Sequence, residues 1–128
     1  MSELTTIPDG FSFTIDRSIW LRGEGSEHSR LLRPHDNKMC CVGICLRALG
    51  VPDSLLLDMQ VAGNVAGGSA VAADLADKIT AEIAYGDHGK VTLGIYTAND
   101  SALIDDVGRE EILTKRFKQI GINVAFEG

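Results

Sequence analysis

The sequence of 128 residues lacks a long apolar run, an even set of cysteines and an excess of positive charge. No stretch reaches the roughly 18 apolar residues of a membrane-spanning helix, so we expect no membrane contact. Three cysteines are an odd number, which argues against a disulfide framework and for a reducing compartment. The net charge of −6 disfavours general nucleic-acid binding, because that activity needs a cationic face.

The rest of the composition is that of an ordinary globular protein. Hydrophobic residues make up 45% of the chain, which is too high a share for a disordered protein. The length fits one domain, residues 1–128, and is sufficient for a substantial core. The amino terminus lacks the basic start and apolar stretch of a secretion signal, which predicts a cytoplasmic location.

Alternating apolar and polar residues predict strands near both ends of the chain. The pattern is regular from Phe11 to Ile15 and again from Ile122 to Phe126. A less regular version predicts an irregular strand through Ile19 and Leu21, and another strand over residues 91–96.

A buried helix is predicted from about Lys38 to Leu49, because this segment is apolar nearly all round. Asp36 or Asn37 is a suitable N-cap, and Gly50 is suited to end the helix. Gly43 lowers the helix propensity of this segment. The glycine would be tolerated if a neighbouring element packed closely against it.

Three further helices complete the set of expected elements. A short helix follows Asp53 through Leu57, and a second covers residues 74–84. The third is amphipathic, with Asp105 or Asp106 as its cap, and reaches Ile120. Together the elements predict an α+β fold in which a small mixed or antiparallel sheet packs with the buried cysteine-containing helix and the C-terminal amphipathic helix.

Charge is distributed unevenly along the chain. Residues 17–47 carry six cations and three anions, whereas residues 48–108 carry two cations and nine anions. Such asymmetry concerns partners rather than fold. The basic segment indicates contact with a carboxylate or phosphate, unless its arginines pair with acidic residues of the same chain. The acidic segment is a rival contact surface, suited to a basic partner protein.

Five residues of the basic segment form a candidate ligand- or partner-binding set: Arg17, Trp20, Arg22, Arg30 and Arg33. An aromatic ring flanked by arginines can stack a planar ligand while the guanidinium groups bind anionic oxygens. Tryptophan and arginine are also the enriched anchors of protein interfaces. The alternative is that Trp20, the single tryptophan of the sequence, fills the core.

Cys40 and Cys41 are weak catalytic candidates, with His35 as the nearby imidazole. A nucleophilic thiol needs a pKa lowered by a helix N-terminus or an imidazole, and this segment offers both. The alternative is that the thiols pack in the core. Zinc needs four converging ligands, which three thiols within one apolar helix do not supply. We therefore expect no metal and no cofactor.

Six short segments carry a resemblance to other proteins. They are Asp16 to Gly23, Ser29 to Leu32, Met39 to Gly43, Asn99 with Asp100, Arg109 to Glu111, and Gly121 to Val124. In these segments the chain resembles a group of small uncharacterised proteins found in bacteriophage and bacterial genomes. The group has no established activity, so the resemblance implies a phage or prophage setting and no catalytic residue.

The expected function is therefore that of a phage- or prophage-type accessory protein, which would act in the host cytoplasm if it is phage-encoded. Small accessory phage proteins often bind host factors, so we expect binding of a host protein or of a small anionic molecule. One alternative is a small thiol-dependent enzyme that uses Cys40 or Cys41. Another is a structural or assembly protein that forms homo-oligomers through the edges of its terminal strands.

Overall fold

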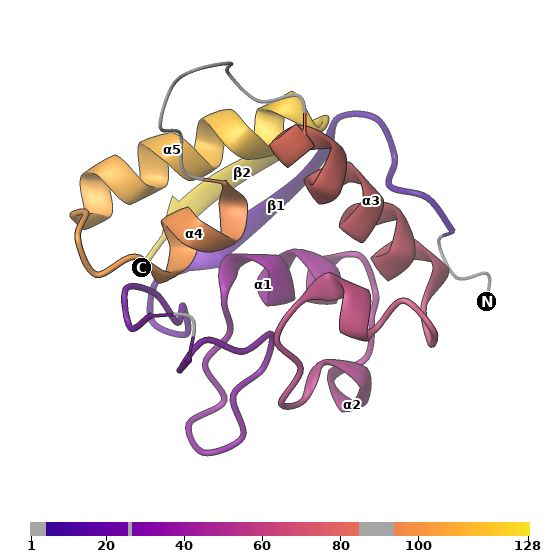
Figure 1. Cartoon of the computed structure of the whole chain (residues 1–128), viewed down its shortest axis with the longest axis horizontal. Coiled ribbons are helices and arrows are strands. Elements are labelled where there is room, and N and C mark those ends of the chain that lie inside the picture. Colours follow the sequence, from indigo (N-terminus) through magenta and orange to yellow (C-terminus); the bar gives the residue numbers. More distant parts are fainter. Residues whose placement is uncertain (1–4, 26, 85–93) are drawn as a thin grey trace.

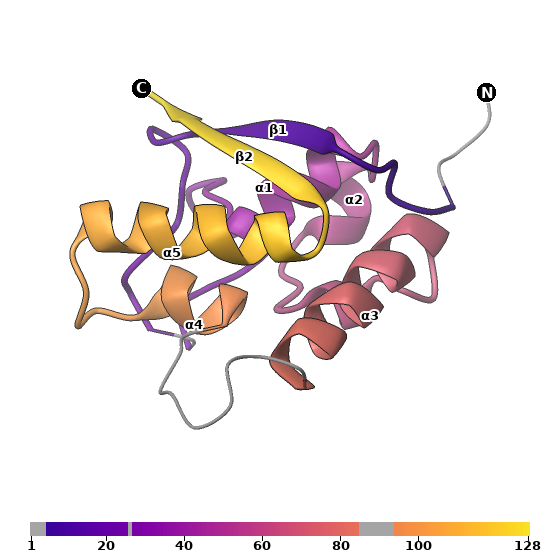
Figure 2. The ribbon, with the colours of Figure 1, turned by 90° about the horizontal axis from the view of Figure 1, so that it is seen from above.

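The computed structural model describes residues 5–25, 27–84 and 94–128 (Figure 1). In chain order the elements are β1 (Phe11–Asp16), α1 (Cys41–Ala48), α2 (Asp53–Leu56), the 3₁₀ helix η1 (Ala62–Asn64), α3 (Ala70–Ala84), α4 (Ile95–Asp100), α5 (Asp106–Gln119) and β2 (Ile122–Glu127). The sheet lies on one side of α1 and α5, and α3 and α4 lie on the other (Figure 2). The expected α+β class is confirmed.

The sheet is a parallel pair of strands, so the expectation of a mixed or antiparallel sheet is wrong. β1 and β2 are in register from Phe11 opposite Ile122 to Asp16 opposite Glu127. All the helices of the described residues lie between the two strands in the chain, and this long connection lets β2 return in the direction of β1. The alternation of apolar and polar residues within a strand is the same in parallel and antiparallel pairs, so the sequence pattern could not reveal the direction of β2.

One face of the sheet is apolar and the other is polar. Phe13, Ile15 and Ile122 are buried, whereas Ser12 and Asn123 on the opposite face are exposed. The expected strands at both ends of the chain are therefore confirmed. This pattern is typical of a sheet with one face on the core and one in water.

The central helix is buried as expected but begins at Cys41 rather than near Lys38. Residues Cys41 to Leu46 are all buried, and Cys40 takes the N-cap position expected for Asp36 or Asn37. The backbone of Met39 bonds to Ile19 and Leu21 instead, forming an isolated bridge between Trp20 and Met39. That bridge is also what remains of the irregular strand expected through Ile19 and Leu21.

The segment around residue 95 is helical, not a strand. Ile95 and Tyr96 open α4, while residues 91–93 of the expected strand lie outside the described part of the chain. α3 begins at Ala70, earlier than the expected residue 74. α5 agrees with expectation, because the side chain of Asp105 accepts a hydrogen bond of 2.7 Å from the Gly108 amide and caps the helix.

Gly43 allows α1 to pack against the backbone of the preceding loop. A Cβ atom added at this glycine would overlap the carbonyl group of Leu31. Gly43 is expected to be tolerated if a neighbouring element packs closely against it, and the backbone of Leu31 packs there in this way.

We expect Gly43→Ala to lower the free energy of unfolding by about 2 kcal/mol, because the clash is with backbone atoms that cannot rotate away. The loss should appear although alanine is the better helix former. Urea unfolding measures it. Gly63→Ala is the control, since no atom lies within 4 Å of a Cβ added there. Equal stability of the two variants would contradict the close approach of α1 and Leu31.

Candidate functional site

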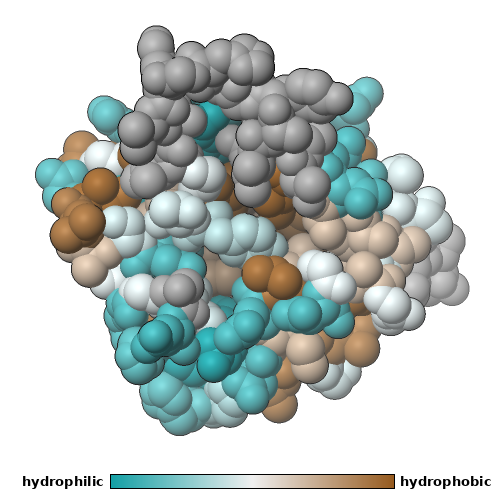
Figure 3. All heavy atoms as spheres, in the orientation of Figure 1, coloured by the Kyte–Doolittle hydropathy of each residue, from teal (hydrophilic) through white to brown (hydrophobic). Residues whose placement is uncertain are grey.

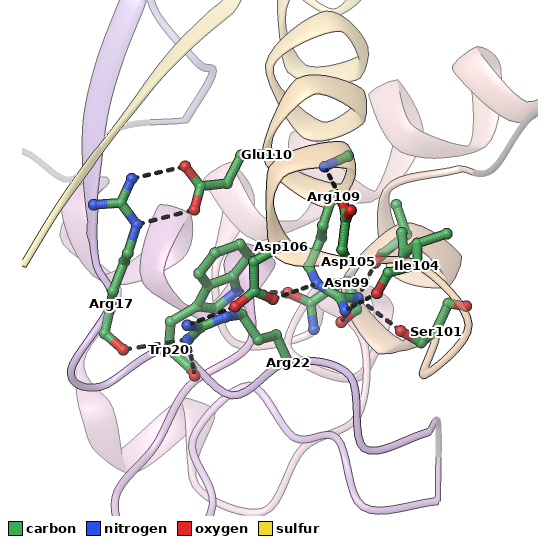
Figure 4. Close-up of polar contacts among 12 residues, drawn as sticks. Arg17, Trp20, Arg22, Asn99, Ser101, Ile104, Asp105, Asp106, Arg109 and Glu110 are labelled. Carbon is green, nitrogen blue, oxygen red and sulfur yellow. Dashed lines mark hydrogen bonds and ion pairs between the residues drawn. The ribbon is translucent and has the colours of Figure 1, made fainter.

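Arg17 and Arg22 are paired with carboxylates at the start of α5 (Figure 4). Arg17 holds both carboxylate oxygens of Glu110, at 2.9 and 2.7 Å. Arg22 lies 3.2 Å from Asp106, and its hydrogen bond lowers the pKa of that carboxyl group. These two ion pairs join the loop after β1 to the first turns of α5.

Arg30 and Arg33 are also paired within the chain. Arg30 lies 3.1 Å from Asp58. Arg33 binds both oxygens of Asp36, at 3.0 and 2.6 Å, and lies 3.1 Å from Glu24. The hydrogen bonds from Arg33 hold the pKa of Asp36 below its usual range. The structure thus gives each of the four arginines an acidic partner, and their contact with a ligand or partner stays a prediction.

Trp20 lies in the core, with 2% of its surface exposed. Its ring contacts the guanidinium of Arg22, 4.5 Å from the ring centre, and the ring of Phe126, whose centre is 5.3 Å away. Its indole N–H donates a hydrogen bond of 2.8 Å to Asn99. No free face of this ring is left for stacking a planar ligand in this arrangement.

Asn99 is a fully buried residue of α4 whose amide joins several segments. Its oxygen accepts hydrogen bonds from the indole of Trp20, at 2.8 Å, and from the amide of Cys41, at 3.0 Å. Its nitrogen donates to the carbonyl of Leu21 and to Asp100. The amide therefore fixes α4 against the start of α1 and the loop after β1.

Arg109 fixes the loop between α4 and α5 from inside the protein. It is 3% exposed, and one of its nitrogens donates to the carbonyls of Ala98 (2.7 Å), Asn99 (3.2 Å) and Ser101 (2.8 Å). A second nitrogen donates to Ile104 at 3.0 Å. The bonds to Ala98, Asn99 and Ser101 bind carbonyls at the end of α4, and the bond to Ile104 fixes the loop that follows.

Sequence reasoning did not select Asn99 or Arg109 as key residues. One signal for Arg109 is present, because it shares a helix face with Leu113 and Phe117, which follow at intervals of four residues and are buried. A charged residue on an apolar helix face needs buried partners. No local pattern marks Asn99, because three of its four partners, Trp20, Leu21 and Cys41, are far away in the chain.

The loop held by Arg109 presents apolar side chains to solvent. Leu103 is 96% exposed and Val107, on the first turn of α5, is 72% exposed. A hollow of about 430 Å³ adjoins Leu103 and is lined by Gly25, Tyr96, Thr97, Asp100, Ser101, Ala102 and Leu103. Figure 3 shows hydrophobic surface on the side of the molecule where this loop lies in Figure 1.

Several carboxylates lie close to these apolar side chains in the sequence. Asp100 lines the hollow, and Asp105 and Glu111 are exposed nearby in the chain. Between residues 100 and 111 the single cation is Arg109, which is buried. We call the hollow, Leu103 and the carboxylates of Asp100 and Asp105 the α4–α5 surface. On this surface the exposed side chain of Leu103 lies among acidic residues that are close in the sequence.

The three cysteines are buried and free. Burial raises the pKa of Cys40 to about 12 and raises that of Cys41 well above its usual value. His35 lies at the surface, with its imidazole 3.7 Å from a carboxylate oxygen of Asp36. Protonated thiols are poor nucleophiles, which favours the packing interpretation over the catalytic one.

Within the residues that the structure describes, no group of three or more His, Cys, Asp or Glu side chains is placed to hold a metal ion. Across the same residues no helix combines the length and apolar character needed to cross a bilayer. The chain matches no protein-family model, no curated protein and no solved structure.

We expect the native thiols to react slowly with iodoacetamide near neutral pH, because burial keeps them protonated and inaccessible. Mass spectrometry counts the modified cysteines over time. The protein in denaturant is the control, where all three should react readily. Rapid modification of Cys40 or Cys41 in the native protein would contradict this expectation and favour the thiol-dependent enzyme.

Asn99→Leu should lower the free energy of unfolding by about 3 kcal/mol or more, because leucine leaves the indole N–H of Trp20, the amide of Cys41 and the carbonyl of Leu21 without a partner. Urea unfolding gives the value. Asn123→Leu is the matched control, since Asn123 is exposed on the polar face of the sheet. A similar small effect in both variants would show that the Asn99 amide does not hold the fold.

Proposed function

We propose that this protein acts by binding another protein at the α4–α5 surface. The observation that carries the proposal is Leu103, which is 96% exposed on a loop that the buried Arg109 fixes through its carbonyls. Full burial of a leucine side chain contributes about 1.5–3 kcal/mol. A loop fixed before binding loses little conformational entropy when a partner covers it.

The charge around Leu103 indicates the chemistry of the partner. Asp100 and Asp105 flank the leucine, and neither has a cationic partner among the described residues. A partner segment with apolar side chains next to lysine or arginine would fit this surface. Complementary charge of this kind speeds association and selects partners more than it adds affinity.

In our proposal the arginine-rich segment stabilises the α4–α5 surface and does not itself contact the partner. Arg17 and Arg22 fix the start of α5 by their ion pairs with Glu110 and Asp106. This arrangement favours the acidic segment over the basic one as the contact surface. We extend the proposal to an accessory role of phage or prophage type, in which the partner is a host protein.

A displayed library of random peptides tests the proposal with the purified protein as bait. We expect selected peptides to combine apolar residues with lysine or arginine. Their affinity, measured as synthetic peptides by calorimetry, should fall roughly tenfold or more in Leu103→Asp, because the central apolar contact is lost. Affinity should also fall as salt is added, because exposed charges are screened.

Leu57→Asp is the matched control, because Leu57 is also an exposed leucine, 44% exposed, and follows α2 rather than α4. This variant should bind the selected peptides as the original protein does. If no peptide is enriched, or if Leu103→Asp and Leu57→Asp bind equally well, the α4–α5 surface is not the contact site.

A further inference from the structure

Among the residues that the structure describes, none pairs with the outer edge of β2, so this edge is open. The amide of Arg17 donates a hydrogen bond of 2.8 Å to the carbonyl of Glu127, which shows that the backbone groups of Glu127 face β1. Backbone groups alternate in direction along a strand. With the observed register, the backbone groups that face away from β1 are those of Ile122, Val124 and Phe126. No described residue makes a hydrogen bond to these groups on the outer side.

The edge carries few of the features that normally prevent strand pairing. Residues 122–126 contain no proline and no charged residue, and the strand ends in Glu127. Figure 2 looks down on β2, and none of the described segments lies across it. Proteins usually protect such edges with lysine, proline, a bulge or a covering segment. The unprotected edge is therefore suited to pairing with another strand.

A groove runs beside this edge along the flank of α5. A hollow of about 580 Å³ is lined by Phe126 of β2 and by a stripe of α5 residues at helical spacing, Val107, Glu110, Glu111, Thr114, Lys115 and Lys118. The stripe is about 16 Å long at the rise of an α-helix. Five steps of a β-strand cover about the same length.

The charges of the stripe have opposite sign at its two ends. Glu110 and Glu111 lie in its first half, and Lys115 and Lys118 lie in its second half. Glu110 is paired with Arg17. Glu111, Lys115 and Lys118 are exposed and have no ion-pair partner among the described residues.

We propose that a second copy of this chain pairs with the open edge, β2 against β2 in antiparallel orientation, about a twofold axis at Val124. Val124 would face its own counterpart, and Ile122 would face Phe126 of the other copy, so that each pair exchanges backbone hydrogen bonds. The result is a continuous four-stranded sheet in which the two α5 helices lie side by side. Such an interface uses the same patch of both copies.

Charge complementarity selects a second copy as the occupant. The proposed twofold axis passes both Val124 and the middle of the stripe, and it places the acidic half of one α5 against the basic half of the other. Glu111 of each copy then faces Lys115 of its counterpart, and the lysine stems and Val107 cover apolar area in the groove. An unrelated strand could pair with the same open edge, but symmetry would not place complementary charges against both ends of the stripe.

This inference is independent of the proposed function, because Leu103 and the hollow beside it lie outside the groove. Val107 lies between the two surfaces and lines the groove. A dimer would therefore carry two separate α4–α5 surfaces, one on each copy. Failure of peptide binding and failure of dimer formation are distinct outcomes.

Sedimentation velocity over a range of concentrations tests the dimer. The original protein should show a concentration-dependent monomer–dimer equilibrium. Lys115→Glu and Glu111→Lys should each raise the dissociation constant roughly tenfold, because two symmetric attractions become repulsions. The double variant, Glu111→Lys with Lys115→Glu, should restore the original constant, because the charges are exchanged but remain complementary. Circular dichroism checks that all variants fold.

Amide hydrogen exchange distinguishes edge pairing from any other contact. In the dimer the amides of Val124 and Phe126 should become protected as concentration rises, whereas those of Asn123 and Ala125 should be protected at all concentrations by β1. A protein that stays monomeric at every concentration overturns the proposal. A dimer whose dissociation constant does not change in the charge variants also overturns it. The same holds for a dimer in which the amides of Val124 and Phe126 stay unprotected.

Discussion

The side-chain amide of Asn99 is the contact on which the rest of the fold depends. It joins α4 to the indole of Trp20 and to the first amide of α1, which are 79 and 58 residues away in the chain. Arg109 then joins the end of α4 to α5. Asn99 contacts the loop that follows β1, and Arg109 lies on α5, which leads directly into β2. Through α4, these two polar residues therefore connect the segments next to both strands of the sheet. A buried amide that makes all its hydrogen bonds specifies one arrangement of its neighbours.

Internal pairing changes what the charge asymmetry means. The basic segment is not an isolated cationic patch, because Arg17, Arg22 and Arg30 bind Glu110, Asp106 and Asp58, which all lie outside that segment. These pairs neutralise one part of the acidic excess and leave the carboxylates around Leu103 without cations. The unpaired carboxylates behind the net charge of −6 thus lie at particular places on the surface and are not spread evenly. An acidic surround with an apolar centre is the basis of the proposed protein-binding role.

α5 has a different task on each of its sides. Its inner face supplies Leu113 and Phe117 to the core and Arg109 to the loop before it. Its first two turns bind Arg22 through Asp106 and Arg17 through Glu110. Its outer flank, from Val107 to Lys118, forms the groove beside the open edge of β2. The helix therefore connects the core to both proposed contact surfaces, and each surface depends on a different set of side chains.

The sequence alone determined the strands at both ends, the buried helix around Gly43 and the capped amphipathic helix from Asp105, because periodicity, caps and glycine positions act within a few residues. The tertiary structure decided that the strands are parallel, that residue 95 is helical, and that Met39 pairs with Trp20 instead of starting α1. It also decided that Trp20 is buried and that Asn99 and Arg109 organise the site. The strand direction, the bridge between Trp20 and Met39 and the contacts of Asn99 depend on partners distant in the chain, which no local pattern encodes. Arg109 binds carbonyls only 5 to 11 residues away, but which carbonyls it reaches depends on how α4 packs beside α5.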